Sequence, residues 1–229
     1  MQKISLCIEP VLEKYNFYDR IKIAKDLGLD AIEFWDTADK DVSKIGSLAA
    51  KNNIDVAICC LKGAWTNRLN FPAVKVVENV KSSIKLAKEM GCKSLIGLSG
   101  DVEGKADSQK NALNSLVDHK GYYLDSSYVG FEIMKSVGCN NIKLLYDIYH
   151  MQIMEGNIIE NIKNNIDFIG HFHSAGVPGR NEHFNGENDY LNILKKIDCT
   201  DYDKYFGLEY WVTYNDEKSI QDVLKYLKE

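Results

Sequence analysis

The chain has 229 residues, of which 45% are hydrophobic and 27% charged, a composition that excludes a disordered chain, a coiled coil and a collagen-like fibre. Its 28 basic and 33 acidic residues give a net charge of -5, which argues against nucleic acid or an anionic membrane as a partner. The N-terminus lacks the apolar stretch of a signal peptide, and no apolar run reaches the roughly 20 residues of a membrane helix. We therefore expect a cytoplasmic protein.

Short apolar runs, typical of strands that are buried on both faces, alternate along the chain with longer runs of helical spacing. In chain order, strands are predicted at 4–8, 31–35, 55–61, 94–99, 142–148, 167–174 and 206–211. Helices are predicted over 17–27, 41–52, 74–90, 129–137, 158–166, 190–194 and 220–227. The apolar stripe of the third helix consists of Val74, Val77, Val80, Ile84 and Ala87.

Regular alternation of strands and helices predicts a parallel sheet with right-handed crossovers, either doubly wound or closed into a barrel. Glycine patterns of dinucleotide and phosphate-binding loops are absent after the first strand, which argues against a doubly wound nucleotide-binding sheet. Polar residues recur at strand ends, which a barrel gathers around one mouth: Glu9, Glu33, Asp147, His173 and Glu209. We predict an α/β fold, a (β/α)8 TIM barrel, as a single domain over 1–229.

The predicted barrel is incomplete, because only seven βα units are recognisable. Residues 101–125 contain no clear helix and at most a weak strand at 111–117. A full barrel of about 250 residues uses about 31 residues per unit, so this chain is short by most of one unit. We expect 100–125 to be the most irregular part of the fold.

Residues that can carry chemistry concentrate in the C-terminal half. Asp147 ends an apolar strand, and His150 follows three residues later. His171 and His173 share one face of the next strand, and Glu209 lies within the last strand among aromatic neighbours. Carboxylates and imidazoles from three successive strand ends can converge on one ion, and such a donor set suits Mn²⁺, Zn²⁺, Co²⁺ or, less well, Mg²⁺.

Each of these residues also has a structural interpretation. Asp147 can cap the segment that follows it, and His171 and His173 can be core histidines bonded to the backbone. Glu209 and Glu33 can each pair with a lysine or arginine. Their recurrence at consecutive strand ends of one barrel favours a shared site.

A glycine-rich loop over 176–187 follows the sixth strand and contains Arg180. Long loops at this face of a barrel usually serve the site, and Arg180 can hold a substrate carboxylate or phosphate through its two-pronged guanidinium. The alternative is a solvated loop arginine. His119 and His183 are predicted to be loop residues.

From Asn141 to Trp211 the sequence resembles the hydroxypyruvate isomerase family of the xylose isomerase-like TIM-barrel superfamily. The matching motifs, in order, are YDIYHMQ at 146–152, EGN at 155–157, IGH at 169–171, VPGR at 177–180, GE at 186–187 and GLEY at 207–210. The segment DAIEFW at 30–35 also matches. The resemblance covers nearly the whole chain and is weakest around 100–117.

This resemblance implies a metal-dependent isomerase of the aldose–ketose type that acts on a small hydroxy-keto acid or sugar through an enediolate. The implied metal ligands are Asp147, His173 and Glu209. The implied proton-transfer residue is Glu209. The implied substrate contacts are His150, Arg180 and His171. The sequence leaves open which ion is bound and whether the protein is a homo-oligomer.

One departure from the family concerns its fifth strand, which ends in a glutamate. Here Asn111 occupies that position, before Ala112-Leu113-Asn114. The simplest explanation is that helix four and most of strand five are missing. Two alternatives therefore stay open: a non-catalytic metal- or ligand-binding barrel, and a nuclease of the same superfamily, which the net charge disfavours.

Overall fold

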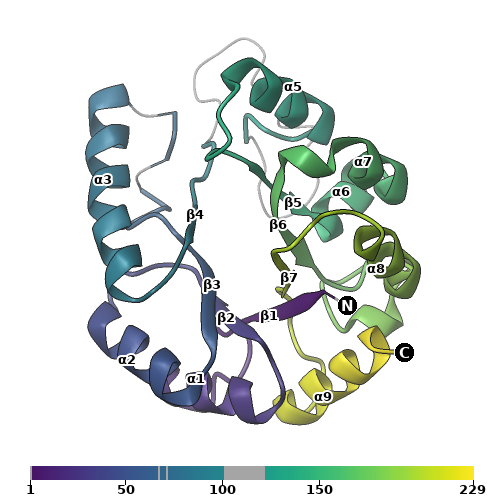
Figure 1. Cartoon of the computed structure of the whole chain (residues 1–229). Coiled ribbons are helices and arrows are strands. Elements are labelled where there is room, and N and C mark those ends of the chain that lie inside the picture. The colour runs from purple at the N-terminus through teal and green to yellow at the C-terminus, as the bar shows by residue number, and fades with distance from the viewer. Residues whose placement is uncertain (1, 67, 71, 101–121) are drawn as a thin grey trace.

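The computed structural model describes residues 2–66, 68–70, 72–100 and 122–229. Its seven strands form one parallel sheet, which curves into a nearly closed barrel with helices on the outside (Figure 1). The strands are β1 (Lys3–Cys7), β2 (Ala31–Phe34), β3 (Asp55–Cys60), β4 (Ser94–Ile96), β5 (Leu144–Asp147), β6 (Ile169–Ser174) and β7 (Tyr205–Leu208). The predicted α/β TIM barrel is thus confirmed.

The strand order is β4-β3-β2-β1-β7-β6-β5, so β4 and β5 are the two edges of the described sheet. Every pairing in it is parallel. No described strand joins β4 to β5, so the described part of the barrel has a seam between these two strands. The weak strand predicted at 111–117 lies outside the described residues, as do His119 and Asn111.

Helices surround the sheet, as the figure shows. They are α1 (Phe17–Asp26), α2 (Val42–Asn52), α3 (Ala73–Glu89), α5 (Ser127–Val137), α6 (Ile148–Met154), α7 (Ile158–Asn165), α8 (Tyr190–Asp198) and α9 (Asp216–Leu227). Several begin at a side chain that accepts a backbone N–H bond of the first turn and so satisfies an otherwise unpaired donor. These caps are Asn16, Asp41, Asp147, Asp189 and Asn215.

Several predicted strand boundaries differ from the structure by one to three residues, and two of these differences concern site residues. The strand predicted at 142–148 ends at Asp147, because Ile148 begins α6, a helix that periodicity did not predict. Glu209 was predicted within a strand, but β7 ends at Leu208, so Glu209 directly follows it. Both acidic side chains therefore lie at the carboxyl ends of their strands.

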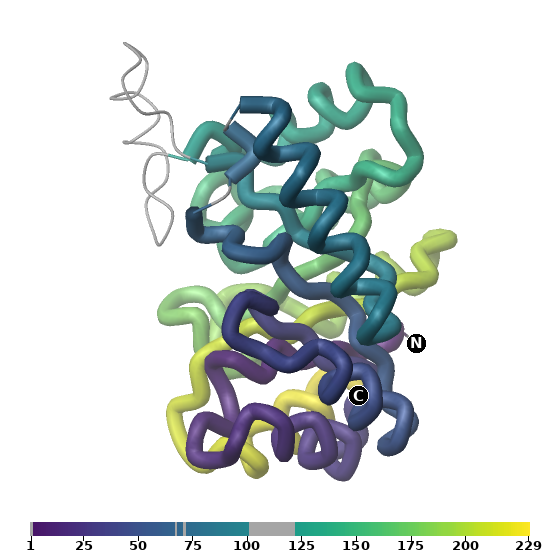
Figure 2. The backbone as a smooth tube through the Cα atoms, turned by 90° about the vertical axis from the view of Figure 1, so that its left-hand side faces the viewer, coloured from purple at the N-terminus to yellow at the C-terminus, as the bar shows by residue number. Residues whose placement is uncertain are grey.

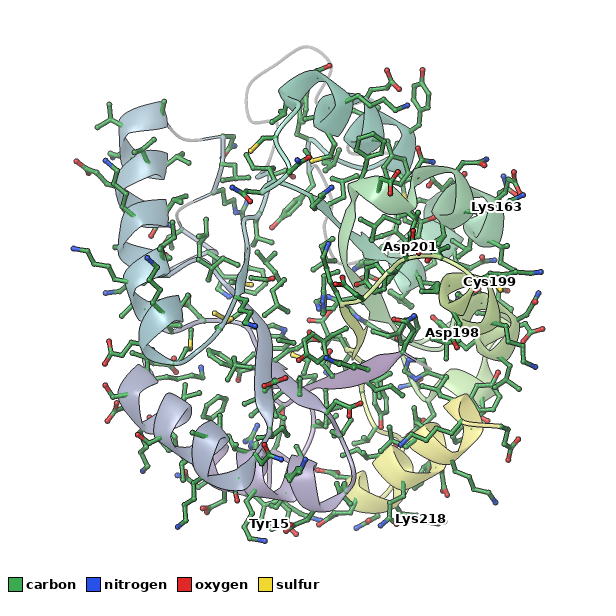
Figure 3. The ribbon with its side chains drawn as sticks, viewed as in Figure 1. Tyr15, Lys163, Asp198, Cys199, Asp201 and Lys218 are labelled. Atoms are coloured by element: carbon green, nitrogen blue, oxygen red, sulfur yellow. The ribbon has the colours of Figure 1, made fainter. Side chains whose placement is uncertain are left out.

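The core lies between the sheet and the helices and inside the barrel. Strand side chains such as Leu6, Phe172 and Phe206 are fully buried. Lys163, Cys199 and Lys218 lie instead on the outside of the barrel, among the helices (Figure 3). Burial of one large apolar side chain contributes about 1.5–3 kcal/mol to stability, so this core is the main source of stability.

The helices are not equally covered. Helix α9 buries Ile220 and Val223 completely. Helix α3, which runs along the face shown in Figure 2, leaves Val74 71%, Val77 49% and Ile84 41% exposed. Because α3 lies beside the edge strand β4, its exposed stripe borders the seam.

Among the described helices, none combines the length and the apolar character that a membrane crossing requires.

Candidate active site

Three strands that are neighbours in the sheet bring the predicted metal ligands together. Asp147 ends β5, His173 lies near the end of β6, and Glu209 follows β7. The register pairs Asp147 with His173, and His173 with Gly207. One donor atom from each of Asp147, His173 and Glu209 lies within 4.8 Å of the other two.

The spacing of these donors fits a divalent ion. His173 Nδ1 lies 3.2 Å from Glu209 Oε2. Metal bonds of about 2.1 Å at right angles place neighbouring ligand atoms about 3 Å apart. Two carboxylates and one imidazole also supply the mixed oxygen and nitrogen donors that Mn²⁺, Zn²⁺ and Co²⁺ accept. The donor set therefore fits the group that the sequence implies.

Arg180 approaches the same carboxylates. Its guanidinium contacts Glu209 Oε2 and lies 3.5 Å from Asp147 Oδ2. The rings of Tyr149 and Trp211 lie 5.2 and 5.0 Å from the guanidinium carbon, within range of a cation–π interaction. Arg180 is only 8% exposed, so it is a buried cation of the site and not a solvated loop residue.

Strand β2 and the residue that follows it contribute two further contacts: Glu33, which the sequence placed at the barrel mouth without a role, and Trp35, which it did not assign to the site. Glu33 Oε1 lies 2.8 Å from His171 Nε2, and Glu33 Oε2 lies 2.8 Å from His173 Nε2. Trp35 Nε1 donates a 2.7 Å bond to Glu209 Oε1. The expected alternative for Glu33, a lysine or arginine partner, is wrong, because the described residues that bond it are the two histidines and Ser5.

The charges of this network are mutually stabilised. Burial alone would raise the pKa of Glu33, but His171 and His173 lower it to about 2. Burial would likewise raise the pKa of Glu209, yet His173, Arg180 and the Trp35 N–H hold it well below its usual range. Burial would lower the pKa of His173, but Glu209 and Glu33 raise it well above its usual value.

The structure places the three predicted substrate contacts differently. His150 lies on α6, with Nε2 3.6 Å from Asp147 Oδ2, while its backbone N–H donates a 3.2 Å bond to the Asp147 side chain. Asp147 therefore also has the capping role that was its structural alternative. His171 is bonded to Glu33. All three predicted contacts, His150, His171 and Arg180, line a cavity of about 2130 Å³.

His183 lies outside this cluster, in a short 3₁₀ turn over His183–Asn185. It is completely buried, and its Nε2 lies 2.9 Å from Ser174 Oγ. Ser174 Oγ itself donates to the Gly207 carbonyl, so His183 is the donor of the pair. Burial lowers the pKa of His183 to about 3, so it is a neutral structural histidine.

The family model of the xylose isomerase-like TIM barrel matches residues 116–229. The hydroxypyruvate isomerase of Escherichia coli is 27% identical over 241 aligned positions, which cover 92% of this chain and 93% of that protein. The 2-oxo-tetronate isomerase of Cupriavidus necator is 41% identical over 93 residues, covering 41% of this chain and 36% of that protein.

The alignment with the E. coli protein also bears on the shortened barrel. Its 241 positions include 92% of the 229 residues, about 211, so about 30 positions have no counterpart in this chain. That number is close to the roughly 31 residues of one βα unit. The comparison therefore supports the predicted loss of about one unit.

Solved structures share the architecture. An AP endonuclease of family 2 from Brucella melitensis superposes with a TM-score of 0.88 at 20% identity, covering 99% of both chains. An L-ribulose 3-epimerase superposes with a TM-score of 0.73 at 20% identity, covering 100% of this chain and 92% of the other. At such identities the likeness shows the fold alone.

Proposed function

We propose that this chain, whose residues 116–229 match the family model of the xylose isomerase-like TIM barrel, is a metal-dependent isomerase of a small hydroxy-keto acid or sugar. One observation carries the proposal: Asp147, His173 and Glu209 converge within 4.8 Å at one end of the barrel. Arg180 and a cavity lie beside them. The names of the curated relatives, hydroxypyruvate isomerase and 2-oxo-tetronate isomerase, support a small keto acid as the substrate.

The proposed reaction moves a carbonyl between two adjacent carbons. A base takes a proton from the hydroxyl-bearing carbon, and the electron pair of that C–H bond forms a carbon–carbon double bond. The former carbonyl oxygen then carries the negative charge of an enediolate. Return of the proton to the former carbonyl carbon, together with transfer of the hydroxyl proton to the negatively charged former carbonyl oxygen, completes the isomerisation. No redox cofactor is consumed, since one carbon is oxidised as its neighbour is reduced.

Glu209 is the proposed proton-transfer residue. Its lowered pKa keeps the carboxylate ionised at neutral pH, which is the form that a general base must have. Trp35 and Arg180 hold its two oxygens in place. Asp147, His173 and Glu209 would hold the divalent ion. When bound, such an ion supplies positive charge beside the substrate oxygens on which the enediolate charge develops.

Arg180 is the proposed contact for the carboxylate of a keto acid. Its guanidinium can form two parallel hydrogen bonds to a carboxylate, and the rings of Tyr149 and Trp211 stabilise its charge. His150 lies at the cavity beside Asp147 and is a second proposed substrate contact. His171 remains a third, although its Nε2 is bonded to Glu33.

Aldose–ketose interchange needs one proton-transfer group on one face of the enediolate, whereas epimerisation usually needs a group on each face. Glu209 is the carboxylate that we assign to proton transfer, and the family's second glutamate is replaced by Asn111. We therefore propose isomerisation over epimerisation. The replacement also favours one competing candidate, a barrel that binds a metal or ligand without turnover.

Proton exchange with solvent separates the enzyme from the non-catalytic barrel. The full chain with Mn²⁺ is incubated with hydroxypyruvate in D₂O, and ¹H NMR follows loss of the C3 protons and growth of an aldehyde signal. We expect the wild type to exchange and isomerise, and Glu209→Gln to be slower by about 10²–10⁴-fold. Glu182→Gln is the matched control, because this buried carboxylate bonds Thr213 and Ser219 instead of the site.

Two results would decide against the proposed function. Equal exchange in the wild type and Glu209→Gln would remove Glu209 from the reaction. Tight binding of hydroxypyruvate by the wild type without any exchange would identify a non-catalytic barrel.

A further inference from the structure

We infer that β2 and the residue directly after it position the ligands of the proposed metal site: Glu33 in β2 fixes the orientation of the His173 ring, and Trp35 fixes the Glu209 carboxylate. The inference rests on the proposed metal site and goes beyond it, because neither residue belongs to the ligand set. In the sheet, β1 separates β2 from β7, and β6 lies one strand further. The two contacts therefore reach across the interior of the barrel.

Glu33 determines which nitrogen of His173 faces the donors. An ionised carboxylate only accepts hydrogen bonds, so the Nε2 atom 2.8 Å from Glu33 Oε2 carries a proton and donates it. Nδ1, the other ring nitrogen, lies 3.2 Å from Glu209 Oε2. In a neutral ring this Nδ1 holds the lone pair, the form in which imidazole binds a metal. Carboxylate–histidine pairs of this kind orient metal ligands in many sites.

The position of Glu33 is itself tightly determined. The side chain is only 2% exposed, and Ser5 Oγ on β1 donates to its Oε1. Gly207 on β7 leaves the space that Glu33 and His171 occupy. A Cβ atom at Gly207 would lie 2.6 Å from Glu33 Oε1 and 2.8 Å from His171 Nε2, closer than real contacts allow. Position 207 therefore requires glycine. Ser5, His171 and His173 hold the Glu33 carboxylate from several sides.

Trp35 acts on the second ligand in the same way. It lies two residues after Glu33, so both side chains point to the same face of the extended segment. Its indole N–H donates a 2.7 Å hydrogen bond to Glu209 Oε1. Oε2 is thereby directed toward His173 Nδ1 and Arg180. Glu33 and Trp35 are thus positioning residues, which orient the oxygen and nitrogen that would bind the ion.

Metal affinity of the full chain tests this inference. We would measure the Kd of Mn²⁺ by calorimetry for wild type, Glu33→Gln, Trp35→Phe and the control Glu182→Gln. An amide has a single acceptor oxygen and cannot accept from both histidines, so we expect Glu33→Gln to weaken binding by about 10–100-fold. Trp35→Phe should weaken it less, because Glu209 keeps its contact with Arg180. Glu182→Gln should lower the Tm but leave the Kd unchanged.

The visible absorption of bound Co²⁺ gives a readout that loss of stability alone would not move. We expect its band positions to shift in Glu33→Gln and to stay as in wild type in Glu182→Gln. If Glu33→Gln fails to fold, Ser5→Ala and Trp35→Phe carry the same test, and a weakened Kd in them supports the inference.

Two outcomes would overturn the inference, and they differ in what else they remove. The positioning role alone would be rejected if the wild type binds Mn²⁺ and Glu33→Gln has the same Kd and the same Co²⁺ spectrum. The same result in both Ser5→Ala and Trp35→Phe would also reject it. A wild type that binds no divalent ion would reject the metal site and the positioning role together.

Discussion

The two sides of this barrel differ in how their helices and strands are covered. On the side of β1, β7 and β6, each strand pairs with two neighbours, and α9 buries its whole apolar stripe. On the side of the seam, β4 and β5 each have one partner among the described strands, and α3 exposes most of its stripe. Only Asp147, of the three proposed ligands, comes from an edge strand. The site thus depends mainly on the paired side of the barrel, and its donor atoms lie within 4.8 Å of one another.

An isoleucine-to-alanine substitution in α9 and one in α3 should measure how differently the two helices are covered. Ile220 in α9 is fully buried and Ile84 in α3 is 41% exposed. We expect Ile220→Ala to lower the free energy of unfolding by about 2–5 kcal/mol, because it leaves a cavity. Ile84→Ala should cost less than about 1 kcal/mol, because its side chain is already partly in water. Urea denaturation of both variants provides the comparison.

Equal losses at the two positions would contradict the difference in coverage. In that case the stripe of α3 would be as well packed in solution as that of α9.

On the paired side, buried His183 should make the free energy of unfolding depend on pH. The pKa of buried His183 is lowered to about 3, whereas its ordinary value is 6.5. The unfolded chain therefore binds a proton that the folded chain does not, and the stability that neutral His183 preserves above pH 6.5 is lost as the pH falls toward 3. Between pH 7.5 and pH 5 this loss is about 2 kcal/mol.

His183→Gln keeps a donor for Ser174 but cannot titrate. Its free energy of unfolding should therefore fall by about 2 kcal/mol less than that of the wild type over the same pH range. Parallel pH profiles for the two proteins would show that His183 is not buried in the neutral form.

A smaller effect is expected at the N-terminus of α9. Asn215 accepts the Lys218 N–H at 3.0 Å, whereas α3 begins at Pro72 without a side-chain cap. Asn215→Ala should cost about 1 kcal/mol, and Asn215→Ser, which keeps a capping oxygen, only a few tenths. Thermal melts of both variants test this, and an alanine variant as stable as the serine variant would show that the cap contributes nothing.

The sequence predicted the order and type of most elements because strands buried on both faces leave long apolar runs that helices interrupt. It did not predict α6, whose seven residues follow β5 without a break. The stripe of α3 is typical of a covered helix, yet Val74 and Val77 are exposed. Periodicity along one segment shows which face is apolar, but it does not show whether another segment covers that face.

The candidate site was predictable for the residues that lie at the carboxyl ends of neighbouring strands. Asp147, His173 and Glu209 each stand at such a position, and parallel neighbours bring these ends together. The roles of Glu33 and Trp35 were not predictable in this way, because their partners lie 140 and 174 residues away across the barrel. The available signal was their spacing of two residues at the end of a strand, which places both side chains on the inner face.

Thermal unfolding with and without excess Mn²⁺ tests directly whether Asp147, His173 and Glu209 form a metal site. Asp147→Asn is the informative variant, because asparagine retains the cap on α6 and removes the charge. At a free Mn²⁺ concentration of about 100 times Kd, binding stabilises the folded chain by about 2.7 kcal/mol, which raises the Tm by about 5–10 °C. We predict this rise in the wild type and little or none in Asp147→Asn at the same concentration. An equal rise in both proteins, or no rise in the wild type, would contradict the proposed site.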